Sequence, residues 1–335
     1  MPERKRIMLV GEAFGEREEQ KGRPFVGPSG ALLDAFLSAA GIARNECYLT
    51  NVFNLRPEAN KILTLCGPKA DGIPGYPSLQ KSKYVSLEYK SEVDRLLREV
   101  NEVNPNLIVA LGSTACWALL KAPSIKKLRG APSLSITGHK VLPTYHPAAV
   151  LREMKLRPIV YSDFKKIALE ADFPEIRRPA REIWTEPNLS DIVKFDAYIQ
   201  EMDRLSVDIE TWNRQITIFG IGDRNRVLVI PFIWRGTKDR NYWPTLEAEL
   251  FVWGYIRKWL FSGKPLVGQN FLYDANYLWS KYGLPALNIE GDTMLLHHAM
   301  QPEMEKSLGF LGSIYTNEPS WKFMRKGITT LKKED

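Results

Sequence analysis

The chain has 335 residues, of which 44% are hydrophobic and 25% charged, and its formal net charge is +7. The length predicts about two domains, the composition is that of a soluble globular protein, and the charge permits a polyanionic partner. Three cysteines without C-x-x-C spacing argue against a disulfide framework and against a structural zinc site. The sequence shows no secretory signal and no apolar run of about 20 residues, so we expect a cytoplasmic protein that does not enter a membrane.

The first half of the chain alternates apolar runs with helical spacing. Its expected elements are a strand at 7–10, a helix over 31–37, a strand at 47–52, a helix over 93–103 and a strand at 107–111. A further helix is expected to run through Leu120, with Ser113 as its N-cap. Residues 56–87 are rich in Pro, Gly, Lys and Ser and are expected to form a long loop. This alternation predicts an α/β domain with its functional side chains at the carboxyl ends of the strands.

A charged, proline-containing stretch separates this half from the next. Residues 173–187 carry three prolines and no apolar period, which is typical of a linker. We therefore expect a domain over 1–172, a linker over 173–187 and a second domain over 188–335. The pattern of the second domain predicts helices over 189–202, 246–260 and 273–279 and strands at 205–209, 216–221 and 227–232.

Four short strings lie at the ends of expected strands or in the loops beyond them. They are Gly11-Glu12-Ala13-Phe14-Gly15, Gly22-Arg23-Pro24-Phe25-Val26-Gly27, Thr50-Asn51-Val52 and Thr144-Tyr145-His146-Pro147. Removing a base from DNA requires that the nucleotide be flipped out, stacked on an aromatic face and read along its Watson–Crick edge. The four strings contain side chains suited to these tasks.

Each candidate residue has a chemical role and a plainer alternative. Phe25 offers a stacking face, and Asn51 offers the donor and the acceptor that an imide edge such as uracil's requires. His146 can donate to the oxygen that gains charge as the base departs, and Glu12 can position water or stabilise an oxocarbenium-like sugar. Taken singly, Phe25 is also compatible with a core position, Asn51 with a turn cap, and His146 before Pro with a structural role.

The four strings resemble the uracil-DNA glycosylase superfamily, in particular its bacterial and archaeal family-4 type, over about residues 5–170. The resemblance implies a three-layer α/β/α domain, with Glu12 in the water-activating motif and His146 as the donor to the uracil oxygen. It also places Gly11, Phe25 and Asn51 in the base-binding set.

The sequence departs from the family-4 pattern in two respects. The family has Pro at the position of Phe14, and it holds an iron–sulfur cluster through four cysteines, two of which lie upstream of the first motif. This chain has Leu55 at the third cysteine position, and we predict that it has no iron–sulfur cluster.

The second domain carries carboxylates in a pattern suited to metal ions. Asp208 and Glu210 are two residues apart on an expected strand and therefore project to one face, while Asp274 lies near the start of an expected helix, four residues after Asn270. Three or four converging carboxylates hold the two ions of phosphodiester-cleaving enzymes, and such oxygen ligands favour Mg²⁺ or Mn²⁺. For Asp292, which precedes Thr293, the plainer alternative is a helix N-cap.

These strings resemble the DEDD 3′–5′ exonucleases, which are RNase H-like, and in particular the proofreading domain of family A DNA polymerases. The resemblance implies Asp208, Glu210 and Asp274 as metal ligands, with Asn270 and Asp292 as supports. The family's third motif, Tyr-x-x-x-Asp, is missing, because Leu331 stands where the Tyr belongs before Asp335. We therefore expect an incomplete exonuclease domain, truncated before the third motif and the polymerase domain.

The two resemblances together predict a DNA replication or repair protein of bacteriophage type, in a bacterial or phage-infected cell. The leading hypothesis is that it recognises and excises uracil from DNA, single-stranded or primer-template, and carries an attached exonuclease module. One alternative is a catalytically silent, DNA-binding accessory subunit of a separately encoded DNA polymerase. The other is a metal-dependent exonuclease to which the first domain delivers DNA.

Overall fold

The computed structural model describes residues 6–234, 236 and 240–319, and the chain divides into two compact units. The first unit comprises residues 1–178 together with the chain from 312 onward, and the second unit comprises residues 179–311. Within the described residues, no helix is long and apolar enough to cross a membrane.

The first unit is built on a five-stranded sheet with the strand order β2-β1-β5-β7-β6. The first four strands in this order are parallel, and β6 is antiparallel to β7. The strands are β1 (Ile7–Ala13), β2 (Cys47–Phe53), β5 (Leu107–Leu111), β6 (Ser133–Leu134) and β7 (Lys140–Thr144), and the separate antiparallel pair is β3 (Cys66–Gly67) with β4 (Tyr84–Val85).

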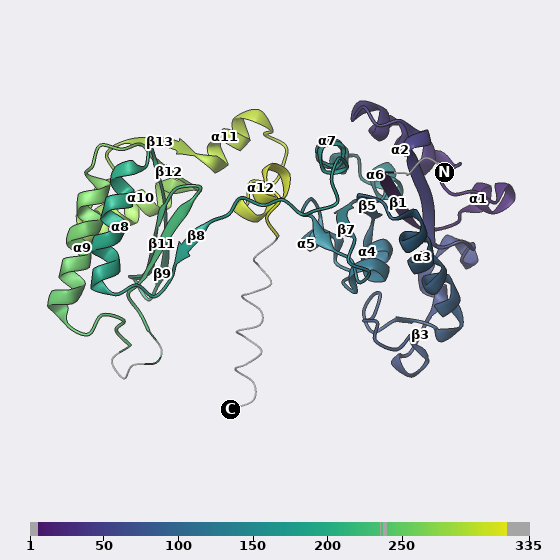
Figure 1. Ribbon diagram of the computed structural model, residues 1–335, viewed down its shortest axis with the longest axis horizontal. Helices are drawn as coiled ribbons and strands as arrows, with labels where there is room; N and C mark the ends of the chain where they lie inside the picture. The colour runs from purple at the N-terminus through teal and green to yellow at the C-terminus, as the bar shows by residue number, and fades with distance from the viewer. Residues whose placement is uncertain (1–5, 235, 237–239, 320–335) are drawn as a thin grey trace. The chain divides into compact units, whose positions relative to one another are not determined.

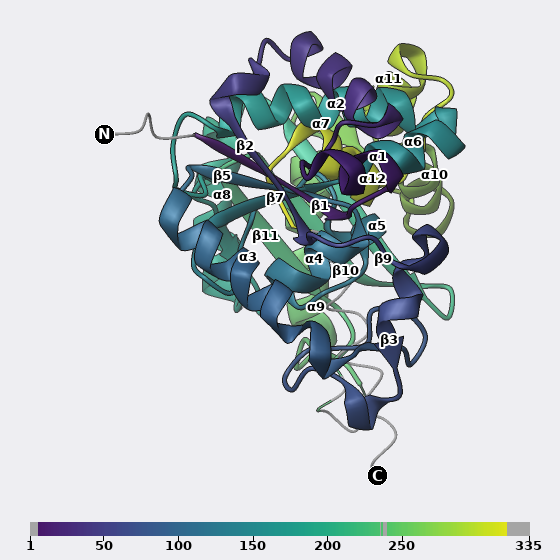
Figure 2. The same ribbon diagram turned by 90° about the vertical axis from the view of Figure 1, so that its right-hand side faces the viewer.

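Helices cover both faces of this sheet, as Figure 2 shows with α2 and α7 above the strands and α3 below them. The α-helices are α1 (Glu16–Lys21), α2 (Pro28–Ala39), α3 (Lys90–Val103), α4 (Ser113–Leu120), α5 (Ile125–Leu128), α6 (Pro147–Arg152) and α7 (Arg157–Glu170). Short 3₁₀ turns lie at Arg44–Glu46, Glu58–Asn60, Ile62–Leu65, Lys69–Asp71, Leu87–Tyr89 and Met154–Leu156.

Alternation of side chains along β1, an inner strand of the sheet, explains the two layers. Met8 and Val10 of β1 belong to the hydrophobic cluster that contains α3 and α4, whereas Ile7 and Leu9 belong to the cluster that contains α2, α6 and α7. Successive side chains of a strand point to opposite faces, so a fully apolar strand is buried on both. The predicted three-layer α/β/α arrangement of the first domain is confirmed.

The second unit is also an α/β structure, with a six-stranded mixed sheet in the order β13-β12-β9-β10-β11-β8 (Figure 1). Strands β9, β10 and β11 form an antiparallel meander, and β12 is parallel to β9. The strands are β8 (Glu182–Trp184), β9 (Leu205–Trp212), β10 (Gln215–Gly222), β11 (Arg226–Pro231), β12 (Leu266–Gly268) and β13 (Ile289–Asp292). The helices are α8 (Leu189–Glu201), α9 (Leu246–Leu260), α10 (Phe271–Tyr282), α11 (Thr293–Met300) and α12 (Leu308–Tyr315), the last of which crosses the unit boundary.

The chain passes from the first unit to the second after Arg178, which lies inside the expected linker at 173–187. Lys140, which is fully buried, donates to the Glu175 carbonyl and lies over the Phe173 ring, so the start of the expected linker packs on the first unit. Residues 182–184, near its other end, pair with β11 as strand β8. The composition of the stretch is polar, but its backbone and charged side chains are used in both units.

Candidate active site

A cavity of about 510 Å³ opens at the carboxyl ends of the first unit's parallel strands, and we call it the base cavity. Glu12 at the end of β1, Asn51 in β2 and His146 just after β7 line this cavity. Phe25, from the loop between α1 and α2, completes the set. The structure thus brings together all four residues singled out from separate sequence strings.

Gly11 is the residue that makes room for two of them. A Cβ atom at this position would lie 2.2 Å from the Asn51 Oδ1 atom and 2.6 Å from Cζ of Phe25. Both distances are far below van der Waals contact, so only glycine allows the amide and the ring to lie this close to β1. Gly11 therefore shapes the base cavity without lining it.

Phe25 is held in a left-handed backbone conformation, with φ at 56°. This region is unfavourable for a residue with a side chain and persists only where the surroundings enforce it. Arg44 donates to the Phe25 carbonyl across 2.9 Å, and Glu18 Oε1 accepts from the backbone N–H groups of Val26 and Gly27 at 3.0 and 2.8 Å. The loop is thereby fixed on both sides of the ring.

The ring of Phe25 stacks against the imidazole of His146, with their centroids 5.9 Å apart and an interplanar angle of 27°. Asn51 is 3% exposed, and its side-chain amide makes no hydrogen bond to any part of the chain that the structure describes. The backbone carbonyl of Asn51 accepts from Arg95 at 2.9 Å, which fixes the end of β2. The amide donor and acceptor of Asn51 are therefore available to a ligand in the base cavity.

The imidazole of His146 has a defined tautomer. Its Nδ1 atom accepts a hydrogen bond from the backbone N–H of Ala148 at 3.1 Å, as the N-cap of α6. A backbone N–H can only donate, so in the neutral ring the proton is on Nε2. Burial, with a further contribution from the positive charge of Arg152, lowers the pKa of His146 to about 4, against the opposing effect of Glu18. The side chain is consequently a neutral Nε2–H donor at physiological pH.

Glu12 has a partner that the sequence strings did not indicate. The hydroxyl of Thr114, in the first turn of α4, donates to Oε2 of Glu12 across 2.5 Å. Strand β5 runs beside β1, so the helix that follows β5 starts next to the end of β1. Thr114 leaves the other carboxylate oxygen of Glu12 for water or substrate.

Two residues at departures from the family-4 pattern are joined by the backbone. The N–H of Phe14 donates to the carbonyl of Leu55 at 3.1 Å, a bond that proline cannot make because it lacks the donor. Leu55 packs against the hydrophobic cluster of α3 and α4. Phe14 itself lines the base cavity and so changes its wall relative to the family-4 pattern.

The thiols do not fit an iron–sulfur cluster. All three cysteines are described, and Cys47 and Cys116 lie in the hydrophobic clusters on opposite faces of the sheet. Burial raises the pKa of the Cys116 thiol to about 12, which disfavours the thiolate that a metal requires. Cys47, Cys66 and Cys116 therefore do not by themselves make up the four thiolate ligands that such clusters take.

The second unit brings some of its candidate carboxylates near one another. Asp208 and Glu210 lie on the exposed face of β9, since the residues between and beside them are buried. Asp274 of α10 is 4% exposed, and its Oδ1 accepts from the backbone N–H of Ile209 at 2.9 Å. Desolvation, with smaller contributions from the charges of Asp208 and Asp292, raises the pKa of Asp274 to about 6.

Asp292 is used by the backbone, as the N-cap alternative predicted. Its two carboxylate oxygens accept from the N–H groups of Asn270 and Phe271 at 3.0 and 2.8 Å, and Oδ1 also accepts from Met294 as the N-cap of α11. Asn270 is the N-cap of α10 and has a left-handed backbone conformation, with φ at 54°. These bonds join the starts of α10 and α11.

Within the described residues, no group of three or more His, Cys, Asp or Glu side chains is placed to hold a metal ion. Asp208, Glu210 and Asp274 thus do not by themselves fit the predicted Mg²⁺ or Mn²⁺ site. The interval from Leu331 to Asp335, on which the prediction of a missing third motif rests, lies outside the described residues.

Comparisons with known proteins agree with the geometry of the first unit. A family model described as the uracil DNA glycosylase superfamily matches residues 1–170. The chain is 38% identical over 165 residues to a type-4 uracil-DNA glycosylase of Thermotoga maritima, covering 48% of this chain and 75% of that protein. It is 34% identical over 170 residues to the type-4 uracil-DNA glycosylase of Saccharolobus solfataricus, covering 48% and 69%.

Two further similarities are weaker. The chain is 25% identical over 213 residues to a DNA polymerase of Bacillus phage SP01, which covers 62% of this chain and 21% of the polymerase. This stretch is longer than the 170 residues that the family model matches. The solved exonuclease domain of EXD2, soaked in Mn and GMP, aligns with 42% of this chain and 71% of that chain at 16% identity and a TM-score of 0.26.

Proposed function

Because the chain belongs to the uracil DNA glycosylase superfamily, we propose that its first unit hydrolyses the N-glycosidic bond that joins uracil to deoxyribose in DNA. The observation that carries the proposal is the base cavity, in which Glu12, Phe25, Asn51 and a neutral His146 face one space of about 510 Å³. Similarity to type-4 uracil-DNA glycosylases supports the same reaction.

We assign one step of the reaction to each of these side chains. The flipped uracil stacks on Phe25, and the Asn51 amide donates to and accepts from its imide edge. As the bond between C1′ and N1 breaks, the electron pair moves into the base, and His146 Nε2–H donates to the oxygen that becomes negative. Glu12, oriented by Thr114, positions the water that adds to C1′ and accepts the proton released from it. The uracil anion then takes up one proton from the solvent and Glu12 releases the proton that it accepted, so the products are an abasic sugar and free uracil.

The direct test is incubation of the full chain with single-stranded DNA that contains one uracil, followed by alkaline cleavage at abasic sites. We expect cleavage at the uracil and none in the matching thymine oligonucleotide. In His146→Asn the amide oxygen can still accept from the Ala148 N–H, but the side chain is shorter, so its N–H group does not reach the uracil oxygen. This variant should lose most of the activity. His298→Ala, at an exposed histidine of the second unit, is the matched control. Wild-type chain that neither cleaves nor binds the uracil oligonucleotide would refute the proposal.

We also infer that the chain works with a DNA polymerase, either as part of one or beside a separate polymerase chain. The supporting observation is the similarity to the phage polymerase, which covers more of the chain than the glycosylase match does. Exposed Asp208 and Glu210 on one face of β9, next to Asp274, support a second unit of the exonuclease type.

Primer-template binding and 3′-end shortening separate the possibilities for this second unit. Since the described carboxylates do not make up a complete cation site, we expect binding to primer-template DNA without shortening. Shortening that requires Mg²⁺ or Mn²⁺ and disappears in Asp208→Ala would instead show an active exonuclease. Absence of both DNA binding and polymerase co-purification would overturn the inference.

A further inference from the structure

The chain returns to the first unit after the second unit has been completed. It leaves the first unit after Arg178 and re-enters it at Gly312, and we call residues 312–318 the return segment. The family model ends at residue 170 and does not include it. We propose that the return segment is required for full activity of the glycosylase unit. Its contacts hold Arg129, Asp163 and Thr144 in place, and these residues in turn position His146. This inference rests on the proposed function.

The return segment is docked by a lysine that donates to three carbonyls. Lys166 of α7 lies 2.7 Å from each of the carbonyl oxygens of Gly130, Ser313 and Thr316. The last two belong to the final turn of α12 and the residue after it, where carbonyl groups lack partners within the helix. Lys166 thus joins the end of this helix to the loop at Gly130.

The absence of a side chain at Gly130 allows this contact. It has φ at +76°, and a Cβ atom here would lie 2.3 Å from the Ser313 carbonyl oxygen. A side chain at this position would displace the return segment, because the obstructing atom belongs to the backbone. Gly130 therefore lets the backbone of the return segment pack closely against the rest of the first unit.

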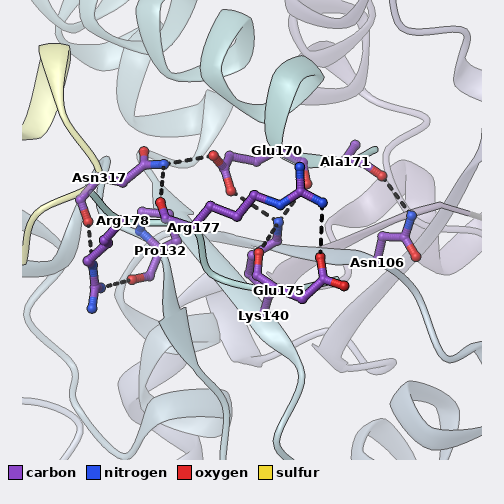
Figure 3. Close-up of polar contacts among 9 residues, drawn as sticks. All are labelled: Asn106, Pro132, Lys140, Glu170, Ala171, Glu175, Arg177, Arg178 and Asn317. Carbon is purple, nitrogen blue, oxygen red and sulfur yellow. Dashed lines mark hydrogen bonds and ion pairs between the residues drawn. The ribbon is translucent and has the colours of Figure 1, made fainter. Parts of the chain in front are cut away.

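A second set of polar contacts holds the far end of the segment (Figure 3). The side chain of Asn317 donates to Glu170 Oε1 at 2.7 Å, and the other oxygen of Glu170 accepts from the buried Lys140 at 3.0 Å. Arg178 donates to the carbonyls of Asn317 and Pro132 at 2.9 and 2.8 Å. The last residues before the second unit and the first residues after it are thereby fixed together on the first unit.

From the docked segment, a chain of buried polar groups leads toward the base cavity. Arg129 donates to the hydroxyl of Ser313 and, at 2.6 Å, to Oδ1 of Asp163. Oδ2 of Asp163 accepts from the hydroxyl of Thr144, also at 2.6 Å. Arg129, Asp163 and Thr144 are at most 5% exposed. A buried charge pair depends on complete partnering, so a disturbance of one member is felt by the others.

Thr144 is the last residue of β7 and stands two positions before His146. Its hydroxyl is fixed by Asp163, and its carbonyl accepts from the N–H of Gly112 at 2.9 Å. Gly112 has φ at +89°, and a Cβ there would be only 3.2 Å from Cβ of His146. The contacts of Thr144 thus fix the direction in which the chain leaves β7. The side chain of His146 packs against the backbone of Gly112. Displacing the return segment would loosen this arrangement.

The experiment compares Gly130→Ala with Gly138→Ala in the full chain. Gly138 has φ at +82° with nothing within 4 Å of an added Cβ, so it shares the backbone strain but not the contact with Ser313. We expect Gly130→Ala to speed amide hydrogen exchange over 312–318 and to lower kcat for uracil excision about tenfold to a hundredfold, with KM nearly unchanged. We expect Gly138→Ala to do neither.

The ring ¹⁵N resonances of His146 give a readout that does not depend on activity. They should shift in Gly130→Ala and stay unchanged in Gly138→Ala. Lys166→Met, which removes the three carbonyl contacts without changing a glycine, should reproduce the effect if Gly130→Ala does not fold. Fast exchange over 312–318 with unchanged His146 resonances would overturn the inference. A wild-type chain without uracil excision would instead refute the proposed function and leave the His146 comparison interpretable.

Discussion

Thr114 donates its hydroxyl hydrogen to the carboxylate of Glu12 although the two residues are 102 positions apart. The contact exists because β1 and β5 are parallel neighbours, so that the end of one strand meets the helix that follows the other. A carboxylate that must orient water benefits from having one oxygen fixed. Thr114 is thus a positioning residue for Glu12.

Thr114→Val replaces the hydroxyl by a methyl group of similar shape and leaves Glu12 without this donor. We expect kcat for uracil excision to fall about tenfold while KM changes little, because orientation of the water matters only during bond breaking. Thr114→Ser retains the donor and should keep most of the activity. Equal kcat values for the Val and Ser variants would show that Thr114 does not orient Glu12.

The sequence was sufficient for elements whose apolar pattern is regular. The strand at 107–111 and the helix at 246–260 occur with the expected bounds. The expected long loop at 56–87 instead contains 3₁₀ turns and the β3–β4 pair, and it buries Leu65, Ile73 and Val85. Its apolar residues are separated by turns, so they have no period that a sequence reading can detect.

The candidate site was predictable only where a residue sits in a recognisable string. Glu12, Phe25, Asn51 and His146 do so, and the cavity contains all four. Thr114 and Glu18 act through partners set by strand order and loop geometry, which local sequence does not encode. The return segment contacts residues about 140 to 190 positions earlier, and no local pattern marks such a pairing.

His146 should remain neutral across the physiological range, with its proton on Nε2. We expect the ¹⁵N resonances of its ring to show the Nε2–H tautomer and no titration between pH 5 and 8, because burial lowers its pKa to about 4. Between pH 6.5 and 4 the unfolded chain binds more protons at this residue than the folded chain does. Its contribution to the free energy of unfolding therefore decreases as the pH falls through this window.

A midpoint for His146 near pH 6.5, or a proton on Nδ1, would contradict both the N-cap contact with Ala148 and the proposed donor role.

Gly11→Ala tests whether the close approach of β1 to Asn51 and Phe25 shapes the base cavity. The added Cβ would displace two side chains rather than backbone, so we expect little loss of stability. We expect kcat/KM for uracil excision to fall about a hundredfold, since displaced binding groups misalign the base. Gly254→Ala, in α9 with open space around the added Cβ, is the matched control and should leave excision unchanged. Full activity of Gly11→Ala would place the base elsewhere than between Asn51 and Phe25.

Asp274→Asn tests how much the buried carboxylate of Asp274 lowers the free energy of unfolding of the second unit. The pKa of Asp274 is raised to about 6, so between pH 4 and 6 the folded state binds more protons than the unfolded state, and the free energy of unfolding falls as the pH rises. Above pH 6 this penalty is fully present. The amide oxygen of asparagine can still accept from the Ile209 N–H and carries no charge. We therefore expect Asp274→Asn to raise the free energy of unfolding by about 2 kcal/mol at pH 8 and to change it little at pH 4.

Denaturant unfolding of the full chain at several pH values, followed through the second unit's tryptophans, measures this difference. Asp203→Asn changes an exposed carboxylate of the same unit and is the control. A loss of stability in Asp274→Asn at pH 8 would mean that the charged form of Asp274 is the one that the fold requires. In that case a cation or a positively charged group must compensate the carboxylate, as in a metal-dependent second unit.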